Sequence, residues 1–309
     1  MTDPILDPEI AAALARDLAK YGPRETLTAG NAAAQRADFV RRRLERGLVG
    51  GPAMRRSRDI DARIAGRTIR VRLHEPEAAP SVGPVLFYFH GGGWVWGSVD
   101  SHDRIMRELA HRSGHRVLGV DYRKAPEHPF PAAFEDCRDS VAWAAGNAGT
   151  LGIDPGRFAL GGDSAGANLA LAVGLDQAAV ARAPATMLLF YGTFDDDLET
   201  ASYRAAFGDG RCGLSRRDMA IFLDLYLGRD RGACDARALP LRGQFDRLQR
   251  AFLLGCGLDP LRDDTRRLAG ALAGAGVDFE FAEIPTANHG FLALVEDVAL
   301  ARTALRRPG

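Results

Sequence analysis

Apolar and polar positions repeat with two different periods along the chain, and the change of period marks the predicted elements. In residues 8–21 apolar side chains recur every fourth residue, which places them on one face of a helix. A second helix is expected at 31–46. Residues 56–64 and 68–75 instead alternate apolar and polar side chains one by one, which is typical of half-exposed antiparallel strands.

Continuous apolar runs follow, and such runs indicate strands that are buried on both faces. The runs lie at 85–89, 117–120, 158–160, 187–191, 251–254 and 279–284. Most are separated by segments of helix length, at 101–113, 131–146, 165–180, 262–274 and 291–306. Alternation of strand and helix predicts βαβ units. We therefore expect an α/β fold with a mostly parallel eight-stranded sheet and helices on both of its faces.

Two regions depart from this alternation. Residues 1–50 precede the first strand, and residues 192–245 interrupt the sequence of strands and helices with several glycines and a helical stretch near 215–227. Both regions are candidates for a lid over an active site. The remaining segments, 51–191 and 246–309, are expected to form the catalytic domain.

Charge and composition exclude several classes of protein. The 309 residues include 40 basic and 40 acidic side chains, and 46% of the chain is hydrophobic. A disordered chain and a nucleic-acid-binding protein are therefore not expected, because the first needs low hydrophobicity and the second a basic surface. No apolar run approaches the roughly 18 to 20 residues of a membrane span. The start of the chain lacks the features of a signal peptide, so the expected location is the cytoplasm.

The four cysteines are spread along the chain and form no C-x-x-C pair, so neither a zinc site nor a redox motif is indicated. Reduced thiols are expected, with a Cys212–Cys234 disulfide as the open alternative. His111 and His115 have the spacing of two metal ligands on a helix, but no third ligand is evident. The prediction is an enzyme without metal or cofactor.

Residues 162–166, Gly-Asp-Ser-Ala-Gly, match the G-x-S-x-G pattern of a nucleophile elbow. An apolar strand precedes the motif and a helical segment follows it, which is the setting that this turn requires. Ser164 is therefore the candidate nucleophile. The helix that starts at Ala165 would bring free N–H groups and a positive dipole end close to it.

Three glycines follow His90, directly after the predicted strand 85–89. Glycines leave backbone N–H groups free to point into a pocket, so this loop and Ala165 can bind the oxyanion of an acyl-transfer reaction. A flexible glycine turn is the alternative, which the nearby serine motif makes less attractive.

A serine nucleophile needs a base, and the base needs an orienting carboxylate. His289 follows the last predicted strand, and Asp259 follows the strand 251–254 with Pro260 fixing the chain beyond it. The order Ser164, Asp259, His289 is the order found in α/β-hydrolases. Asp263 and Asp264 are expected at the start of a helix, where carboxylates favour the positive dipole end.

Five motifs together resemble the hormone-sensitive-lipase-like group of α/β-hydrolase esterases, in its bacterial subgroup with Gly-Asp-Ser-Ala-Gly. They lie at 90–93, 121–133, 162–166, 259–263 and 289–291. The resemblance implies hydrolysis of short-to-medium acyl esters without a cofactor. It also implies a helical cap made of residues 1–50 and the insertion 192–245.

The same resemblance assigns roles to residues. Ser164 is then the nucleophile, His289 the general base and acid, and Asp259 the residue that orients the histidine. The implied oxyanion hole consists of the N–H groups of Gly92, Gly93 and Ala165. The chain departs from the group at Thr265, where a tyrosine is frequent, and at Asn288, where an apolar residue is usual. These departures leave substrate range open.

Other interpretations remain at this point. Trp94 and Trp96 flank the glycine loop and either line the substrate pocket or pack beneath the cap. The same triad serves amidases, acyltransferases and sugar deacetylases, and related folds include receptors without catalysis. The expected partner is a small-molecule ester, with a homodimer as an open alternative.

Overall fold

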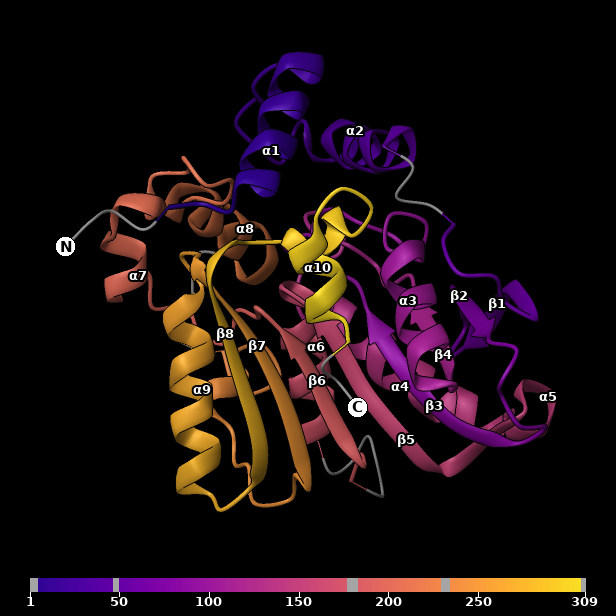
Figure 1. Ribbon diagram of the computed structural model, residues 1–309. Coiled ribbons are helices and arrows are strands. Elements are labelled where there is room, and N and C mark those ends of the chain that lie inside the picture. The colour runs from indigo at the N-terminus through magenta and orange to yellow at the C-terminus, as the bar shows by residue number, and fades with distance from the viewer. Residues whose placement is uncertain (1–4, 47–49, 177–182, 229–233, 307–309) are drawn as a thin grey trace.

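The computed structural model describes residues 5–46, 50–176, 183–228 and 234–306. Eight strands form one sheet in the order β1-β2-β4-β3-β5-β6-β7-β8. The pairs β1–β2 and β2–β4 are antiparallel, and all other neighbours are parallel. The predicted α/β class and the mostly parallel sheet are confirmed (Figure 1).

The elements follow the chain as the sequence pattern predicts, with local differences. The strands are β1 Arg56–Ile64, β2 Arg67–Glu75, β3 Gly83–Phe89, β4 Arg116–Val120, β5 Ile153–Asp163, β6 Thr186–Phe190, β7 Arg250–Leu258 and β8 Asp278–Asn288. The α-helices are α1 Pro8–Tyr21, α2 Ala32–Glu45, α3 Asp103–Ser113, α4 Ala132–Gly146, α5 Ala148–Leu151, α6 Ala165–Leu175, α7 Ala201–Arg204, α8 Arg216–Leu227, α9 Arg262–Gly274 and α10 Ala299–Ala304. Short 3₁₀ turns are η1 Ala206–Gly208, η3 Pro240–Arg242 and η4 Phe291–Leu294.

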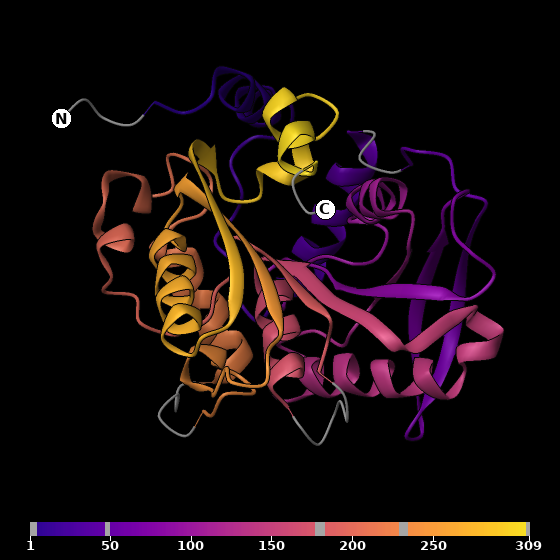
Figure 2. The same ribbon diagram turned by 60° about the horizontal axis from the view of Figure 1, so that its bottom comes forward.

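Helices cover both faces of the sheet, as Figure 2 shows. On one face, α4, α6 and α9 contribute apolar side chains to one core, which also contains Phe87, Phe89 and Leu118. On the other face, α3, η4 and α10 pack against Tyr88 and Phe252. Each central strand therefore contributes to two apolar cores, which explains why its sequence is a continuous apolar run.

The predicted helix 291–306 is wrong, because the structure has two short pieces there. Residues 291–294 form the 3₁₀ turn η4, Val298 has an extended backbone, and α10 begins only at Ala299. All of residues 291–295 are buried. Five consecutive apolar residues cannot lie on a single face of an amphipathic α-helix. The predicted helix 165–180 ends as α6 at Leu175, and its last positions, 177–180, lie outside the described residues.

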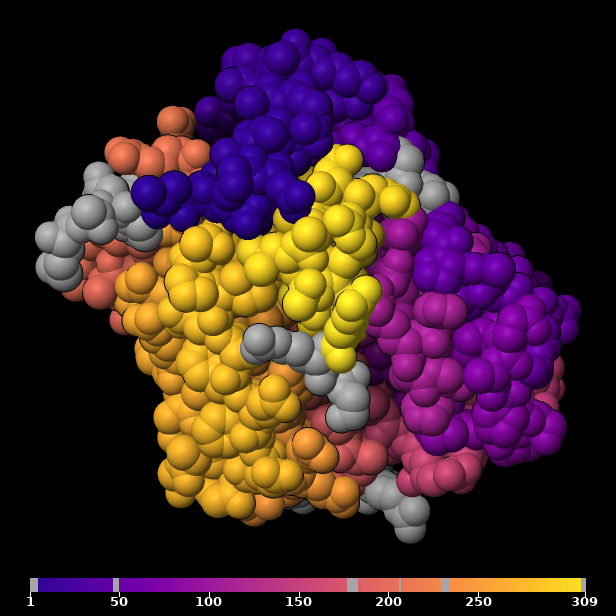
Figure 3. All heavy atoms as spheres, viewed as in Figure 1, coloured from indigo at the N-terminus to yellow at the C-terminus, as the bar shows by residue number. Residues whose placement is uncertain are grey.

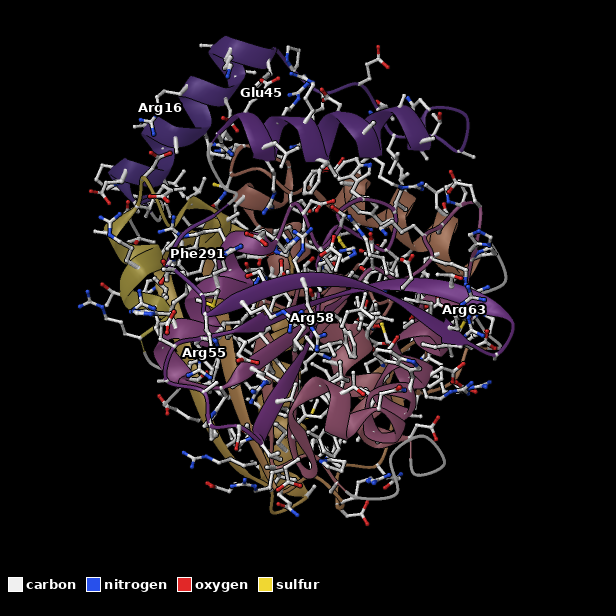
Figure 4. The ribbon with its side chains drawn as sticks, turned by 90° about the vertical axis from the view of Figure 1, so that its right-hand side faces the viewer. Arg16, Glu45, Arg55, Arg58, Arg63 and Phe291 are labelled. Atoms are coloured by element: carbon white, nitrogen blue, oxygen red, sulfur yellow. The ribbon has the colours of Figure 1, made fainter. Side chains whose placement is uncertain are left out.

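The N-terminal helices lie over the edge of the sheet at which the parallel strands end (Figure 1). The first helix contacts the C-terminal segment: the backbone N–H of Ala299 donates to Glu9, and Arg16 forms an ion pair with Asp297 at 3.2 Å. Figure 3 shows these two ends of the chain packed against each other. The second helix lies across the top of the molecule, with Glu45 at the end nearest α1 (Figure 4).

Two further expectations concern the whole chain. Cys137, Cys212 and Cys256 are free cysteines, so the alternative Cys212–Cys234 disulfide is not formed. Among the helices that the structure describes, none combines the length and the apolar character needed to cross a bilayer.

Candidate active site

Three strands end immediately before the three predicted catalytic residues. β5 ends at Asp163 before Ser164, β7 at Leu258 before Asp259, and β8 at Asn288 before His289. Leu258 and Asn288 are paired in the register of β7 and β8. The sheet itself therefore brings Asp259 and His289 together, at the edge where α/β sheets carry their sites.

Ser164 stands in a sharp turn between β5 and α6. Its backbone has φ 54° and ψ −123°, a conformation that costs free energy for any residue other than glycine. Its N–H donates to the carbonyl of Phe190 at 2.9 Å, which holds the turn against the next strand. A Cβ atom on Gly162 or Gly166 would overlap the carbonyl oxygen of Phe89. Positions 162 and 166 of the motif must therefore be glycine, because there is no room for a side chain at either one.

A chain of hydrogen bonds joins the three side chains. Ser164 Oγ lies 2.9 Å from His289 Nε2, and His289 Nδ1 lies 2.8 Å from Asp259 Oδ2. The other carboxylate oxygen of Asp259 accepts the N–H of Leu261 at 2.9 Å. Asp259 is fully buried, and its carboxylate can only accept a hydrogen bond from His289 Nδ1. The proton of the neutral imidazole therefore lies on Nδ1, and Nε2 accepts a hydrogen bond from the Ser164 hydroxyl.

The glycine loop after β3 lies beside the serine turn. Gly92 and Gly93 have φ values of 121° and 60°, which other residues adopt only under strain. Within the described part of the chain, no protein group accepts a hydrogen bond from the N–H of Gly92, Gly93 or Ala165. These are the three N–H groups that the resemblance to the esterase group assigns to an oxyanion hole. Ala165 is the first residue of α6, so the helix dipole adds positive potential there.

Asp163 ties the glycine loop to the serine turn. Its carboxylate accepts from Tyr88 Oη at 2.7 Å and from the N–H of Gly91 at 2.9 Å, and His102 Nε2 lies 3.5 Å away. Burial opposes ionisation of this carboxyl, but His102, the Tyr88 hydroxyl and the charge of Arg43 hold its pKa well below the ordinary value. These hydrogen bonds fix the position of the loop that carries Gly92 and Gly93.

The two tryptophans of this loop differ. Trp94 is 1% exposed, and its ring stacks on Tyr226 at 4.3 Å, so the structure favours packing for this residue. Trp96 stacks on Phe39 of α2 at 5.7 Å and contacts Phe222 of α8 edge-on at 4.9 Å. It also lines a hollow of about 320 Å³ beside α2. Trp96 therefore joins the glycine loop to both regions predicted to form the cap.

Two residues next to the triad escaped the sequence reasoning. Tyr191 has φ 38°, and its ring lies 5.1 Å from the His289 ring in an edge-to-face arrangement. Asn288 donates from Nδ2 to the carbonyl of Cys212 at 2.8 Å and so links the insertion to the residue before His289. No sequence feature indicated a role for Tyr191, because it is simply the last residue of the apolar run 187–191. Asn288 had such a feature, since it replaces the apolar residue usual in the resembled group.

A metal centre requires several ligating side chains that converge on one point. In the described ranges, no group of three or more His, Cys, Asp or Glu side chains is placed to hold a metal ion. The triad and the three N–H groups together contain a nucleophile, a base and an anion site, which is a complete set for acyl transfer.

Comparison with known proteins agrees with this geometry. A family model described as alpha/beta hydrolase fold matches residues 86–293. The chain is 38% identical over 236 residues to carboxylic ester hydrolase LipN of Mycobacterium tuberculosis, a match that covers 74% of this chain and 62% of LipN. It is 35% identical over 243 residues to carboxylesterase NlhH of the same species, covering 76% of this chain and 75% of NlhH.

Solved structures resemble the whole chain. A hyperthermophilic esterase from the archaeon Pyrobaculum calidifontis has a TM-score of 0.90 and 31% identity, and the match covers 98% of this chain and 96% of that one. An ester hydrolase from the metagenome of Lake Arreo has a TM-score of 0.89 and 34% identity over the same shares of the two chains. The resemblance to hormone-sensitive-lipase-like esterases is thereby confirmed, and the chain belongs to the family of α/β-hydrolase fold proteins.

Proposed function

We propose that the protein is a serine carboxylesterase that hydrolyses short-to-medium acyl esters through an acyl-enzyme intermediate. The observation that carries the proposal is the hydrogen-bonded chain from Ser164 through His289 to Asp259, next to three unengaged backbone N–H groups. The similar proteins named as ester hydrolases support it.

Acylation uses His289 first as a base and then as an acid. As Ser164 Oγ attacks the ester carbonyl, its proton passes to His289 Nε2, and the carbonyl oxygen becomes an oxyanion. The N–H groups of Gly92, Gly93 and Ala165 stabilise that charge, each by on the order of 3 kcal/mol. The imidazolium then gives its proton to the leaving alcohol, the carbon–oxygen bond breaks, and the acyl-enzyme remains.

Deacylation repeats these steps with water. His289 takes a proton from water, the resulting hydroxide attacks the acyl carbon, and the proton returns to Ser164 as the acid leaves. Asp259 keeps the Nδ1 proton in place and stabilises the imidazolium in both halves. Because the base must be neutral, activity falls when the pH is lowered far enough to protonate His289.

Residues 1–50 and 192–245 form a cap in this proposal. Contacts between each region and the catalytic loops support it. From α2, Arg36 Nε donates to the carbonyl of Val95 in the glycine loop at 2.6 Å. From the insertion, the N–H of Ser202 donates to Asp263 at 2.7 Å, close to Asp259. Side chains of both regions, including Phe39 and Phe222, would limit the length of the acyl chain.

The test is hydrolysis of p-nitrophenyl esters from acetate to palmitate by the wild type, Ser164→Ala and the matched control Ser113→Ala. Ser113 lies on α3, where its hydroxyl donates to the carbonyl of Leu109 at 2.7 Å. We expect turnover of the short esters, loss of it in Ser164→Ala by a factor on the order of 10⁴ or more, and no loss in the control.

Two results would contradict the proposal. A folded wild type that hydrolyses no ester, and is not labelled at Ser164 by a phosphonate, would indicate a receptor. Labelling of Ser164 with turnover of amides or acetylated sugars alone would indicate a different acyl acceptor or leaving group. The cytoplasmic location and the homodimer remain predictions, which cell fractionation and size-exclusion chromatography with light scattering would test.

A further inference from the structure

Arg43 lies on the face of α2 that is turned toward the catalytic loops. Arg36, on the same helix, donates from its guanidinium to the carbonyls of Val95 and Ala125, at 2.6 and 3.0 Å, so its side of the helix faces the sheet edge. Seven residues make almost two full helical turns, and Arg43 therefore points in nearly the same direction as Arg36. It is half-buried.

The guanidinium of Arg43 has an aromatic neighbour but no anionic partner. It lies 4.7 Å from the ring centre of Phe39, whose ring is in turn stacked on Trp96. Among the described residues, none forms an ion pair or a hydrogen bond with the Arg43 side chain. By contrast, Arg41 and Arg42 on the same helix both pair with Asp38. A partly desolvated guanidinium without an acceptor is costly, and an anion that fills the gap would recover that free energy.

The charge of Arg43 acts on two groups that adjoin the catalytic loops. Burial lowers the pKa of Arg43, and the charge of Asp163, the residue before Ser164, opposes that shift. Burial raises the pKa of Tyr191, whose ring contacts His289, and the charge of Arg43 counteracts the rise. The contact with Phe39, whose ring stacks on Trp96, places the guanidinium beside the glycine loop.

Asp163 does not form an ion pair with Arg43. Its carboxylate already accepts from Tyr88 and Gly91 and lies beside His102, and Arg43 is beyond ion-pair distance from it. The described structure thus holds, next to the stacked rings of Phe39 and Trp96 beside the glycine loop, a guanidinium whose hydrogen-bond donors have no protein acceptor.

We propose that Arg43 binds a carboxylate on the substrate, so that the preferred substrates are short esters that carry one negative charge, such as half-esters of dicarboxylic acids. The inference rests on the esterase function proposed above and specifies its substrate class. A guanidinium offers two parallel N–H donors, which match the two oxygens of a carboxylate. The single positive charge of Arg43 balances the single negative charge of a carboxylate. A doubly charged phosphate would leave one negative charge unbalanced beside Asp163.

The test compares esters with and without the carboxylate. Monoethyl glutarate and its neutral amide, ethyl 5-amino-5-oxopentanoate, place the group on the acyl side. The pair 4-acetoxybutanoate and 4-acetoxybutanamide places it on the alcohol side. We expect kcat/KM to favour the carboxylate by about tenfold to hundredfold in at least one pair, mainly through a lower KM. Arg43→Met should abolish that ratio, and Arg43→Lys should keep part of it.

Arg41→Met is the matched control, because Arg41 lies on the exposed side of the same helix, with 51% of its side chain accessible. It should keep the wild-type ratio. Equal kcat/KM for both members of both pairs in the wild type would overturn the inference, and so would an unchanged ratio in Arg43→Met. If Arg43→Met does not fold, the inference is tested by the carboxylate-to-amide ratio of the wild type and by its partial loss in Arg43→Lys. Turnover of p-nitrophenyl acetate without a preference for carboxylates refutes only this inference, whereas no turnover of any ester refutes the esterase function as well.

Discussion

Two buried aspartates, one beside the serine turn and one in contact with the insertion 192–245, have opposite pKa shifts. On the elbow side, Asp163 ends β5 and has its pKa held below the ordinary value. On the insertion side, Asp264 lies in the first turn of α9, and burial raises its pKa from 3.8 to about 7. Both side chains are nearly inaccessible, at 4% and 1%. Burial therefore does not decide the charge state by itself.

The supply of donors and positive charge makes the difference. Asp163 has the Tyr88 hydroxyl, the N–H of Gly91 and His102 around its two oxygens. Asp264 accepts the N–H groups of Phe194 and Asp195 on one oxygen. Its other oxygen has no hydrogen-bond partner in the described structure and lies 3.9 Å from Arg267 Nη1, whose charge offsets only part of the effect of burial. The elbow side is thus built around a stable carboxylate, and the insertion side around a carboxyl that titrates near neutral pH.

The tight packing of the elbow side gives the largest expected effect. Gly166→Ala places a Cβ on the carbonyl oxygen of Phe89, where backbone cannot give way cheaply. We expect a loss of at least about 3 kcal/mol in the free energy of unfolding, or no folded protein. Urea unfolding measures this. Gly270→Ala in α9 is the control, since nothing lies near its Cβ, and it should gain about 0.5–1 kcal/mol. Equal stabilities of the two variants would show that the elbow tolerates expansion.

Asp163→Asn tests the carboxylate of the elbow side. The amide can replace only part of the acceptors that Tyr88, Gly91 and His102 require, so we expect a loss of about 3 kcal/mol at pH 7.5. The folded pKa is depressed, so this contribution is present above the unfolded pKa of about 4 and is lost only as the pH falls further. The kcat for p-nitrophenyl acetate should also fall about tenfold or more, because Gly91 would no longer fix the oxyanion loop. Unchanged kcat with reduced stability would separate the carboxylate from catalysis.

Asp264→Asn should have the opposite sign. Because the folded pKa is raised from 3.8 to about 7, the native state keeps a proton that the unfolded chain has lost between these values. The stability contribution of Asp264 therefore falls as the pH rises from about 4 to about 7, while His90, whose pKa burial lowers from 6.5 to about 4, contributes a slope of the opposite sign in the wild type and the variant alike. At pH 8 the substitution should stabilise the protein by about 2 kcal/mol, and at pH 4 it should have little effect. Urea midpoints across this range measure the slope, with Asp263→Asn as the neighbouring control. A stability difference between the wild type and Asp264→Asn that stays constant across this window would contradict the assignment, because the slope from His90 is common to both proteins.

The sequence predicted the positions of the strands and helices better than it predicted the surroundings of the two aspartates. The range 262–274 coincides with α9, and the apolar run 85–89 lies within β3, because burial and helix period leave a direct record in residue types. The helix 291–306 was wrong where a short apolar segment is buried on all sides. A local pattern cannot distinguish that burial from the face of a helix.

The same division applies to the site. Ser164, Asp259 and His289 could be predicted as the triad because the turn, the strand ends and the chain order restrict where such residues occur. Tyr191 and Arg43 could not, since a tyrosine at the end of a strand and an arginine on a charged helix are ordinary. Their significance arises only from contacts between segments that are distant along the chain.

Asn288→Ala has the smallest expected effect and tests whether the insertion side acts on catalysis. The side chain donates to the carbonyl of Cys212 at 2.8 Å, and the next residue is His289. Without that hydrogen bond the insertion and the histidine loop lose a direct link, so we expect about 1 kcal/mol less stability and a two- to fivefold lower kcat, with about the same KM for short esters. Asn147→Ala removes a comparable hydrogen bond, to the carbonyl of Trp143 at 2.8 Å, far from the site. If both variants lose similar stability and only Asn288→Ala loses turnover, the insertion positions the base. If neither loses turnover, the elbow side alone determines the catalytic geometry, and the insertion serves only to enclose the substrate.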